Sequence, residues 1–218
     1  MKTSPSRPFP QRGLYVITDC FNLDTAGLLH KSNLILEAGI CALQYRDKTP
    51  EFSIRRERAL ALQKLCARYD TVFLINDDVE LAAVIAADGV HIGRDDASFE
   101  ECRDRLGKGA IIGVSCYNQL QLALQAEKNG ADYVAFGSFY PTLTKTALFR
   151  AAPELLTRAK HQITVPVVAI GGITPVNGAG LLEAGADILA VVSSVYSGDD
   201  PLLAVSEFKA LFSKPWSL

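Results

Sequence analysis

The chain has 218 residues, and its composition, 49% hydrophobic and 21% charged, is that of a globular protein with one sizeable core. Its 22 basic and 24 acidic side chains leave a formal net charge of −2, which excludes a general electrostatic attraction to nucleic acid or to an anionic membrane. Any site that binds anions must therefore be a local one.

The cysteines and the first residues indicate where the protein works. The five cysteines are widely spaced and include no CxxC pair, which suggests neither a zinc knuckle nor a disulfide framework and fits a reducing cytoplasm. The opening MKTSPSRPFPQ lacks the apolar core of a signal peptide, and no apolar run approaches the ~20 residues of a membrane span. We expect a cytoplasmic protein with one domain over residues 1–218, in which residues 1–12 are poorly ordered or pack at the edge.

Short apolar segments that recur along the chain predict eight β-strands. Several of them are apolar on both faces, as is typical of parallel strands that are covered on both sides. In chain order, the predicted strands cover residues 13–19, 40–46, 71–77, 89–93, 110–116, 133–139, 166–173 and 188–195.

The segments between these strands carry helix signals. The stretch from Thr49 to Asp70 predicts a helix with Thr49 as its N-cap and Pro50 at its first position. Asp78 is expected to cap the next helix, and Gly130 is expected to end the helix that precedes the sixth strand.

This alternation of strand and helix, repeated eight times with no linker, predicts an α/β fold: a (β/α)8 TIM barrel in a single domain. An open, doubly wound sheet is the alternative. In a barrel, the active site lies at the carboxyl ends of the strands and in the loops that follow them. Polar residues at those positions are therefore functional candidates.

Cations follow two of the predicted strands. In CALQYRDK, alternation places Gln44, Arg46 and Lys48 on one face of the strand, and Lys145 lies in the hydroxyl-rich segment YPTLTKTALFR. Arg46 can bind phosphate through its planar guanidinium, whereas the two lysines supply mobile point charges. Each segment alone could be a solvated turn or a plain surface loop, but together they predict an anion site.

Carboxylates follow the next two strands. LINDD ends the third strand with Asn76 and Asp77, and HIGRDD places Asp95 and Asp96 one loop beyond the fourth. One or two carboxylates, completed by water and phosphate oxygens, are what Mg²⁺ prefers. Asp77 and Asp96 are therefore candidate Mg²⁺ ligands on one rim, whereas the roles of Asp19 and Asp95 stay open.

The last two strands end in AIGGITP and AVVSS. Glycines allow a backbone to approach a phosphate closely, and helix N-termini direct N–H groups at it. A phosphate site after strands seven and eight is a recurring feature of barrels, although GG alone often marks a tight turn. We expect a backbone phosphate site near Gly172 and Ser193, and hence two phosphorylated substrates on one rim, one of them a diphosphate.

Two further reactive side chains carry weaker signals. His91, within GVHIG, has no paired Ser or Cys and is expected to be a buried, hydrogen-bonded histidine. Cys116 follows Ser115, but nothing nearby in the sequence would activate it as a thiolate.

Taken together, these segments resemble the thiamine-phosphate synthase family. The matching segments are LYVITD, LQYRDK, LINDD, ADGVHIGRDD, IIGVSCYN, GADYVAFGSFYPTLTK, VPVVAIGGIT and GADILAVVSS. They occur in family order from residue 14 to about residue 194, and their Q-x-R-x-K, N-D and T-x-T-K elements are specific only in combination.

The resemblance implies an enzyme that joins 4-amino-5-hydroxymethyl-2-methylpyrimidine diphosphate to the ring nitrogen of a thiazole phosphate, giving thiamine phosphate and pyrophosphate. It also implies a dissociative reaction assisted by Mg²⁺, in which pyrophosphate leaves before the thiazole nitrogen captures the pyrimidine methyl cation. The implied Mg²⁺ ligands are Asp77 and Asp96. The implied catalytic residues are Arg46, Lys48, Ser115 and Lys145. The implied substrate-binding residues are Gln44, Arg46, Lys48, Asn76, Ser115, Thr142, Thr144, Lys145, Gly172, Val192 and Ser193.

Two departures from the family pattern and two rival functions qualify this resemblance. Lys145 is followed by Thr146 and Ala147 where family members usually have Pro and Gly, and Arg94 stands where Gln is common. One rival is a thiazole tautomerase of similar fold, which does not need the diphosphate cluster, and the other is a non-catalytic barrel that binds thiamine phosphates. We expect small-molecule substrates and neither nucleic acid nor membrane as partners, while the formation of a homo-oligomer stays open.

Overall fold

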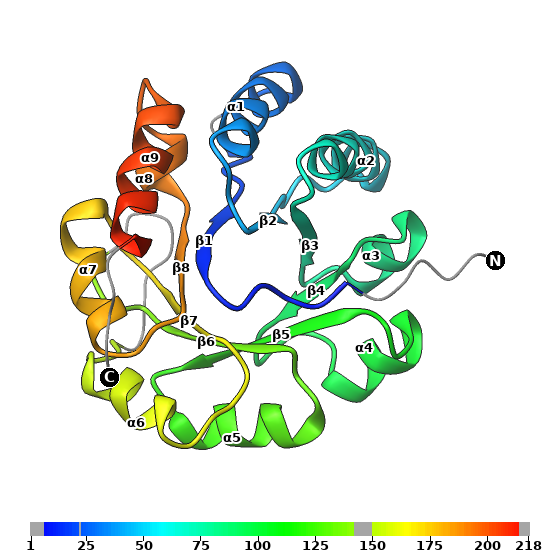
Figure 1. Cartoon of the computed structure of the whole chain (residues 1–218). Helices are drawn as coiled ribbons and strands as arrows, with labels where there is room; N and C mark the ends of the chain where they lie inside the picture. The colour runs from blue at the N-terminus through cyan, green and yellow to red at the C-terminus, as the bar shows by residue number, and fades with distance from the viewer. Residues whose placement is uncertain (1–6, 22, 142–149, 214–218) are drawn as a thin grey trace.

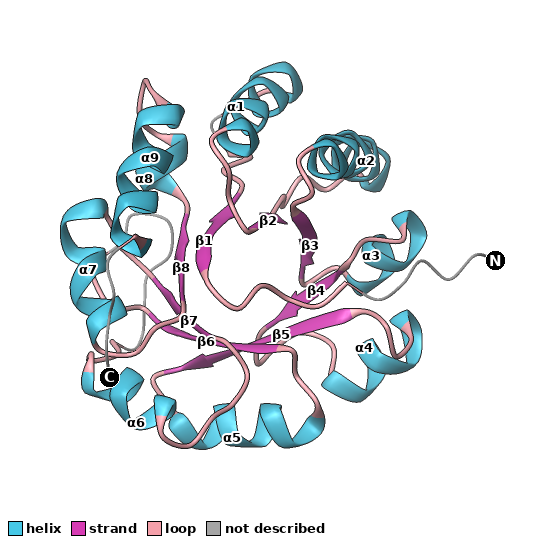
Figure 2. Ribbon diagram, in the orientation of Figure 1, coloured by secondary structure: helices cyan, strands magenta, loops and turns pink. Residues whose placement is uncertain are grey.

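The computed structural model describes residues 7–21, 23–141 and 150–213. Eight parallel strands close into a barrel in chain order, and β1 is hydrogen-bonded to both β2 and β8. Helices surround this barrel on its outer side (Figures 1 and 2). The predicted (β/α)8 fold is confirmed, and the open, doubly wound sheet is wrong because the two edges of such a sheet are joined here.

Most strands are shorter than the sequence predicts. They are β1 (Gly13–Ile17), β2 (Ala42–Tyr45), β3 (Val72–Asn76), β4 (Gly89–Ile92), β5 (Ile111–Tyr117), β6 (Tyr133–Gly137), β7 (Val167–Ile170) and β8 (Ile188–Val191). The predicted strands over residues 166–173 and 188–195 differ most from the structure, and β8 ends at Val191 because a short helix begins at Ser193. There the N–H of Tyr196 donates to the carbonyl of Val192, so the backbone has left the ladder.

The helices of the described residues follow the strands in turn, with one additional helix at the carboxyl end. They are α1 (Thr25–Glu37), α2 (Phe52–Arg68), α3 (Val79–Ile85), α4 (Phe99–Leu106), α5 (Leu120–Asn129), α6 (Glu154–Lys160), α7 (Pro175–Glu183), α8 (Ser193–Tyr196) and α9 (Pro201–Phe212). Two expected boundaries are confirmed. Asp78 caps α3 by accepting from the N–H of Leu81, and Gly130 ends α5 in the left-handed conformation.

The predicted start of α2 is wrong. The helix begins at Phe52, and neither Thr49 nor Pro50 belongs to its first turn. Their carbonyls instead accept hydrogen bonds of 2.6 and 2.9 Å from the guanidinium of Arg55, and the N–H of Thr49 donates to Asp47. Side chains therefore hold this loop in a shape of its own before the helix starts.

The barrel interior contains aromatic rings as well as aliphatic side chains. Tyr15 and Tyr133 are buried there, and the ring of Phe9 stacks on that of Tyr133 at a centroid distance of 3.9 Å. Tyr133 fits because Gly113 lies beside it: a Cβ atom at residue 113 would stand 1.9 Å from the ring carbon Cζ. Phe9 belongs to the segment ahead of β1, which crosses the end of the barrel in Figure 1.

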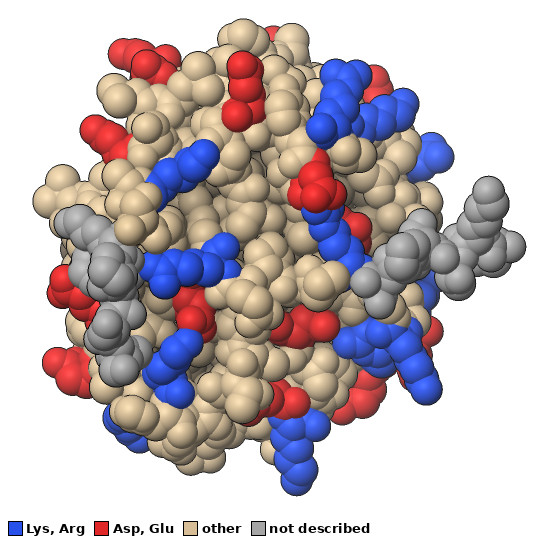
Figure 3. All heavy atoms as spheres, in the orientation of Figure 1, with Lys and Arg blue, Asp and Glu red and all other residues tan. Residues whose placement is uncertain are grey.

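Charges of both signs are mixed over the face drawn in Figure 3, and no broad area of one sign is visible on it. This view agrees with the nearly balanced composition. Within the described residues, every helix is too short or too polar to cross a lipid bilayer.

Candidate functional site

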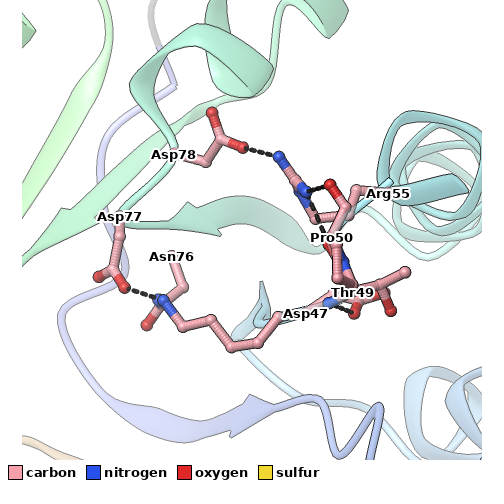
Figure 4. A pocket seen from close by; sticks show the side chains of 8 residues that line it. Asp47, Thr49, Pro50, Arg55, Asn76, Asp77 and Asp78 are labelled. Atoms are coloured by element: carbon pink, nitrogen blue, oxygen red, sulfur yellow. Dashed lines mark hydrogen bonds and ion pairs between the residues drawn. The ribbon is translucent and has the colours of Figure 1, made fainter. Parts of the chain in front are cut away.

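The loops after β2 and β3 bring opposite charges together at the rim of the barrel. Lys48 Nζ lies 2.7 Å from Asp77 Oδ2, and the lysine side chain is 62% exposed. Both residues line a pocket of about 270 Å³ together with Asn76, and Figure 4 shows Asp77 on one side of it and Arg55 on the other. The structure thus places Lys48, Asn76 and Asp77 at one site, as the sequence predicts.

The loop that carries Lys48 is anchored by its neighbour Asp47. The Asp47 carboxylate accepts from Tyr45 Oη at 2.7 Å, from Arg58 Nη1 at 3.0 Å and from the N–H of Thr49 at 2.8 Å. Its side chain is only 2% exposed and that of Arg58 14%, so the ion pair is largely desolvated. Burial opposes ionisation of Asp47, but the hydrogen bonds from Thr49, Tyr45 and Arg58 outweigh it and lower its pKa.

Asp77 and Asp96 lie close enough for each to perturb the pKa of the other. Burial raises the pKa of Asp96, the neighbouring Asp77 raises it further, and the bond from the N–H of Gly93 at 2.6 Å only partly compensates. Burial also acts against ionisation of Asp77, but its bonds to Lys48 and Asp96 lower its pKa. The two carboxylates therefore form an acidic pair from the ends of β3 and β4, with Asp77 the more acidic member.

The backbone at Asp77 is unusual for a residue with a side chain. Its φ of 61° is in the left-handed region, and its N–H donates to the carbonyl of His91 across the β3–β4 pair at 2.9 Å. Such conformations are strained and concentrate at functional sites. At this backbone position the carboxylate of Asp77 contacts Lys48 Nζ.

Arg46 occupies the rim beyond the last residue of β2. Its N–H donates to Thr18 Oγ1 at 2.9 Å, so the end of β1 fixes its backbone. Its side chain is exposed, and within residues 7–21, 23–141 and 150–213 it joins no ion pair. It is therefore a cation available at the same rim as Lys48.

Gln44 and Ser115 lie deeper, in the interior of the barrel. Gln44 is 2% exposed and donates through Nε2 to Tyr15 Oη at 2.5 Å. Ser115 Oγ lies 2.8 Å from His91 Nε2, and His91 Nδ1 lies 2.9 Å from Tyr133 Oη. The expectation of a buried, hydrogen-bonded His91 is confirmed, and the burial of Cys116 raises the pKa of its thiol, which agrees with its expected inertness.

The predicted phosphate site lies where β7 and β8 end. Gly172 has a φ of 64°, and a Cβ atom there would stand 2.3 Å from the carbonyl oxygen of Pro141, so only glycine fits. Val192 and Ser193 mark the start of α8, and Ser194 Oγ donates to the carbonyl of Ile173 at 2.6 Å. That bond holds the two strand ends together and brings Gly172 and Ser193 to one place.

The remaining predicted residues, Thr142, Thr144 and Lys145, lie outside the described residues, as do Thr146 and Ala147. Their placement at the site stays a prediction.

Three residues that shape this site were not predicted from the sequence: Arg58, Tyr15 and Tyr133. Arg58 carried a signal, because it lies four residues before the buried Leu62 and hence on the face of α2 that is turned to the barrel. Gly113 carried another, since a glycine inside a strand often marks the close approach of a bulky neighbour, here Tyr133.

Comparison with known proteins agrees with this geometry. The model of a family described as thiamine monophosphate synthase matches residues 14–195. The thiamine-phosphate synthase of Xylella fastidiosa (strain Temecula1 / ATCC 700964) is 49% identical over 210 residues, which cover 96% of this chain and 88% of that relative. The thiamine-phosphate synthase of Thiobacillus denitrificans (strain ATCC 25259 / T1) is 48% identical over 207 residues, which cover 95% and 97%.

A solved structure resembles the whole barrel. The thiamine phosphate pyrophosphorylase from Pyrococcus furiosus superposes with a TM-score of 0.83 at 34% sequence identity, covering 93% of this chain and 96% of that one. Relatives this similar over almost their full length support a transferase with thiamine-phosphate synthase activity. The match over residues 14–195 and these relatives together establish that the chain belongs to the thiamine monophosphate synthase family.

Proposed function

We propose that the protein condenses 4-amino-5-hydroxymethyl-2-methylpyrimidine diphosphate with a thiazole phosphate, by a dissociative reaction in which pyrophosphate leaves first with the help of Mg²⁺. The observation that carries this proposal is the cluster of Lys48, Asp77 and Asp96 at the rim of a barrel of this family. A departing pyrophosphate needs its growing negative charge neutralised by fixed cations, which is electrostatic stabilisation and requires no strong base.

Asp77 and Asp96 fit a Mg²⁺ ion by their chemistry and by their mutual perturbation. Asp77 raises the pKa of Asp96, and a divalent cation between the two carboxylates would favour the ionised form of both. Among the described residues, no group of three or more His, Cys, Asp or Glu side chains could hold a metal, so water and phosphate oxygens would complete the ligand set. When bound, the ion would supply positive charge against the leaving pyrophosphate.

Residues in β2, β3 and β5 and in the loop after β2 would bind the pyrimidine substrate. Arg46 and Lys48 would hold its diphosphate, Arg46 through two parallel hydrogen bonds and Lys48 as a point charge. Gln44 would hold the pyrimidine diphosphate together with them, and Asn76 would join the same site. Ser115 would donate to the leaving pyrophosphate together with Lys145, which also carries a positive charge.

The ends of β7 and β8 would bind the phosphate of the thiazole. Gly172 allows the close approach of a phosphate, and the N–H groups at Val192 and Ser193 would donate to it. Thr142 and Thr144 would add hydroxyl donors from the segment outside the described residues. The thiazole nitrogen would then face the carbon from which pyrophosphate leaves.

The test supplies the purified protein with the pyrimidine diphosphate, the thiazole phosphate and Mg²⁺. We expect equal amounts of pyrophosphate and thiamine phosphate, measured by a coupled phosphate assay and by chromatography, and no turnover in EDTA. Binding of the thiazole phosphate without release of pyrophosphate would indicate the non-catalytic barrel instead. Isomerisation of a thiazole phosphate in the absence of the pyrimidine substrate would indicate a tautomerase.

A further inference from the structure

An unbroken chain of hydrogen bonds crosses the interior of the barrel from β2 to β5. Gln44 Nε2 donates to Tyr15 Oη at 2.5 Å, and Tyr15 Oη lies 2.9 Å from Tyr133 Oη. Tyr133 Oη lies 2.9 Å from His91 Nδ1, and His91 Nε2 lies 2.8 Å from Ser115 Oγ. Both ends of this chain, Gln44 and Ser115, are residues to which we assign substrate contacts.

The middle of the chain is sealed from water. Tyr15 is 1% exposed and Tyr133 is 0% exposed. The ring of Phe9 stacks on one side of Tyr133, and that of His91 lies parallel to it within 18° at a centroid distance of 5.6 Å. In such surroundings hydrogen bonds are strong and orient one another, and a hydroxyl that loses its partner is costly.

The single hydrogen on each hydroxyl gives the chain one direction. Burial raises the pKa of both tyrosines, so both keep their hydrogen and can donate it. Of these bonds only the one from Gln44 to Tyr15 has a fixed donor, and we assign the others from it. A buried hydroxyl hydrogen without an acceptor is costly, so Tyr15, which accepts from Gln44, is assigned as donor to Tyr133, and Tyr133 as donor to His91 Nδ1. His91 then accepts at Nδ1 and donates from Nε2 to Ser115, which keeps its own hydrogen for the rim.

We propose that Tyr15, Tyr133 and His91 are positioning residues, which hold the Ser115 hydroxyl as a hydrogen-bond donor aimed at the leaving pyrophosphate. This inference rests on the proposed function. Negative charge on the pyrophosphate grows as its bond to carbon breaks, so a donor fixed in advance acts more strongly on the transition state than on the bound substrate. Breaking the chain should therefore lower kcat and leave KM nearly unchanged.

Tyr133→Phe removes one hydroxyl from the middle of the chain and keeps the ring that stacks on Phe9. We expect kcat to fall about 10-fold, which corresponds to about 1.4 kcal/mol, while KM for the pyrimidine diphosphate changes by less than about twofold. In a Ser115→Ala background the same substitution should change kcat by less than about twofold, since its effect passes through Ser115.

The matched control is Ser32→Ala, which breaks another buried hydroxyl pair, the 2.8 Å bond between Ser32 Oγ and Tyr196 Oη. This variant should keep the kcat of the unmodified protein. A Tyr133→Phe variant with unchanged kcat, or equal losses in the presence and absence of Ser115, would overturn the proposal.

A second measurement does not depend on turnover. The chain has three histidines, and His30 and His161 are exposed, so the ¹⁵N NMR signals of the buried His91 can be separated from those of the exposed pair. We expect a hydrogen on Nε2 and none on Nδ1, and a hydrogen on Nδ1 would refute the direction of the chain. If the unmodified protein released no pyrophosphate, the proposed function would be wrong. The ¹⁵N signals of His91 would still decide the direction of the hydrogen-bond chain.

Discussion

Replacing Asp47 by alanine should destabilise the fold more than any loss of a surface ion pair. The substitution removes the acceptor of three hydrogen bonds, from Tyr45, Arg58 and Thr49, and leaves the guanidinium of Arg58 without its carboxylate. Because the two charged side chains are 2% and 14% exposed, water cannot replace the lost partner. Removing one member of a buried pair typically costs about 3–5 kcal/mol.

That magnitude is large against a total stability of about 5–15 kcal/mol. For a chain of 218 residues, each kcal/mol lowers the melting temperature by about 2–4 °C, so Asp47→Ala should melt roughly 10 °C lower. Thermal unfolding and urea unfolding followed by circular dichroism both measure the effect. Since Lys48 is the next residue, we also expect KM for the pyrimidine diphosphate to rise as the loop loses its anchor.

Two further variants test whether the loss of stability comes from the unpaired, buried charge of Arg58. Glu80→Ala breaks an ion pair between Glu80 and Arg105, whose side chains are 61% and 50% exposed, and it should leave the melting temperature nearly unchanged because water screens the pair. The double variant Asp47→Ala with Arg58→Met should be more stable than Asp47→Ala alone, because no buried charge is left unpaired. Equal costs for Asp47→Ala and Glu80→Ala would refute the reasoning.

Three further outcomes follow from the geometry. Gly113→Ala should destabilise the barrel by about 1–3 kcal/mol in urea unfolding, because the new Cβ atom would overlap the ring of Tyr133; an unchanged midpoint would contradict this packing. Asp77→Ala should lower Mg²⁺-dependent kcat by about 10²–10³ and leave calorimetric binding of the thiazole phosphate intact, whereas equal loss of both would count against the metal assignment. The folded pKa of Asp47 is lowered, so the ionised carboxylate stabilises the fold above its unfolded pKa of about 3.9, and this contribution is lost as pH falls through the folded pKa. Asp47→Asn should therefore make the free energy of unfolding depend less steeply on pH below about pH 4. An unchanged pH dependence of that free energy would contradict this assignment.

The sequence predicts the barrel and most of its rim because those features depend on local patterns. The alternation of apolar strands and helices fixed the fold class, and the position of Asp77 and Asp96 after neighbouring strands correctly placed them together. Parallel strands all run from one end of the barrel to the other, so the carboxyl end of each strand is known once the strand is found.

The contacts that the sequence did not predict depend on packing between distant segments. Arg58 reaches Asp47 only because α2 packs on β2, and Thr49 and Pro50 failed as helix starters because Arg55 turns back onto their carbonyls. The interior hydrogen bonds join β1, β2, β4, β5 and β6, so none of their partners is visible from spacing along the chain. Strand patterns that are apolar on both faces also conceal which tyrosines enter the barrel.

The position where β2 ends explains why Gln44 has a different environment from Arg46 and Lys48, although all three are predicted on one face of the strand. Alternation predicts a continuous polar face from Gln44 to Lys48, but β2 ends at Tyr45, and the environments on the two sides of that end differ. Gln44 is inside the strand, buried and committed to Tyr15, whereas Arg46 and Lys48 lie beyond it and are exposed. A diphosphate would therefore meet the two cations at the rim, whereas Gln44 is itself the first member of the hydrogen-bond chain that ends at Ser115. Gln44 thus connects the hydrogen bonds in the interior of the barrel to the site on its rim.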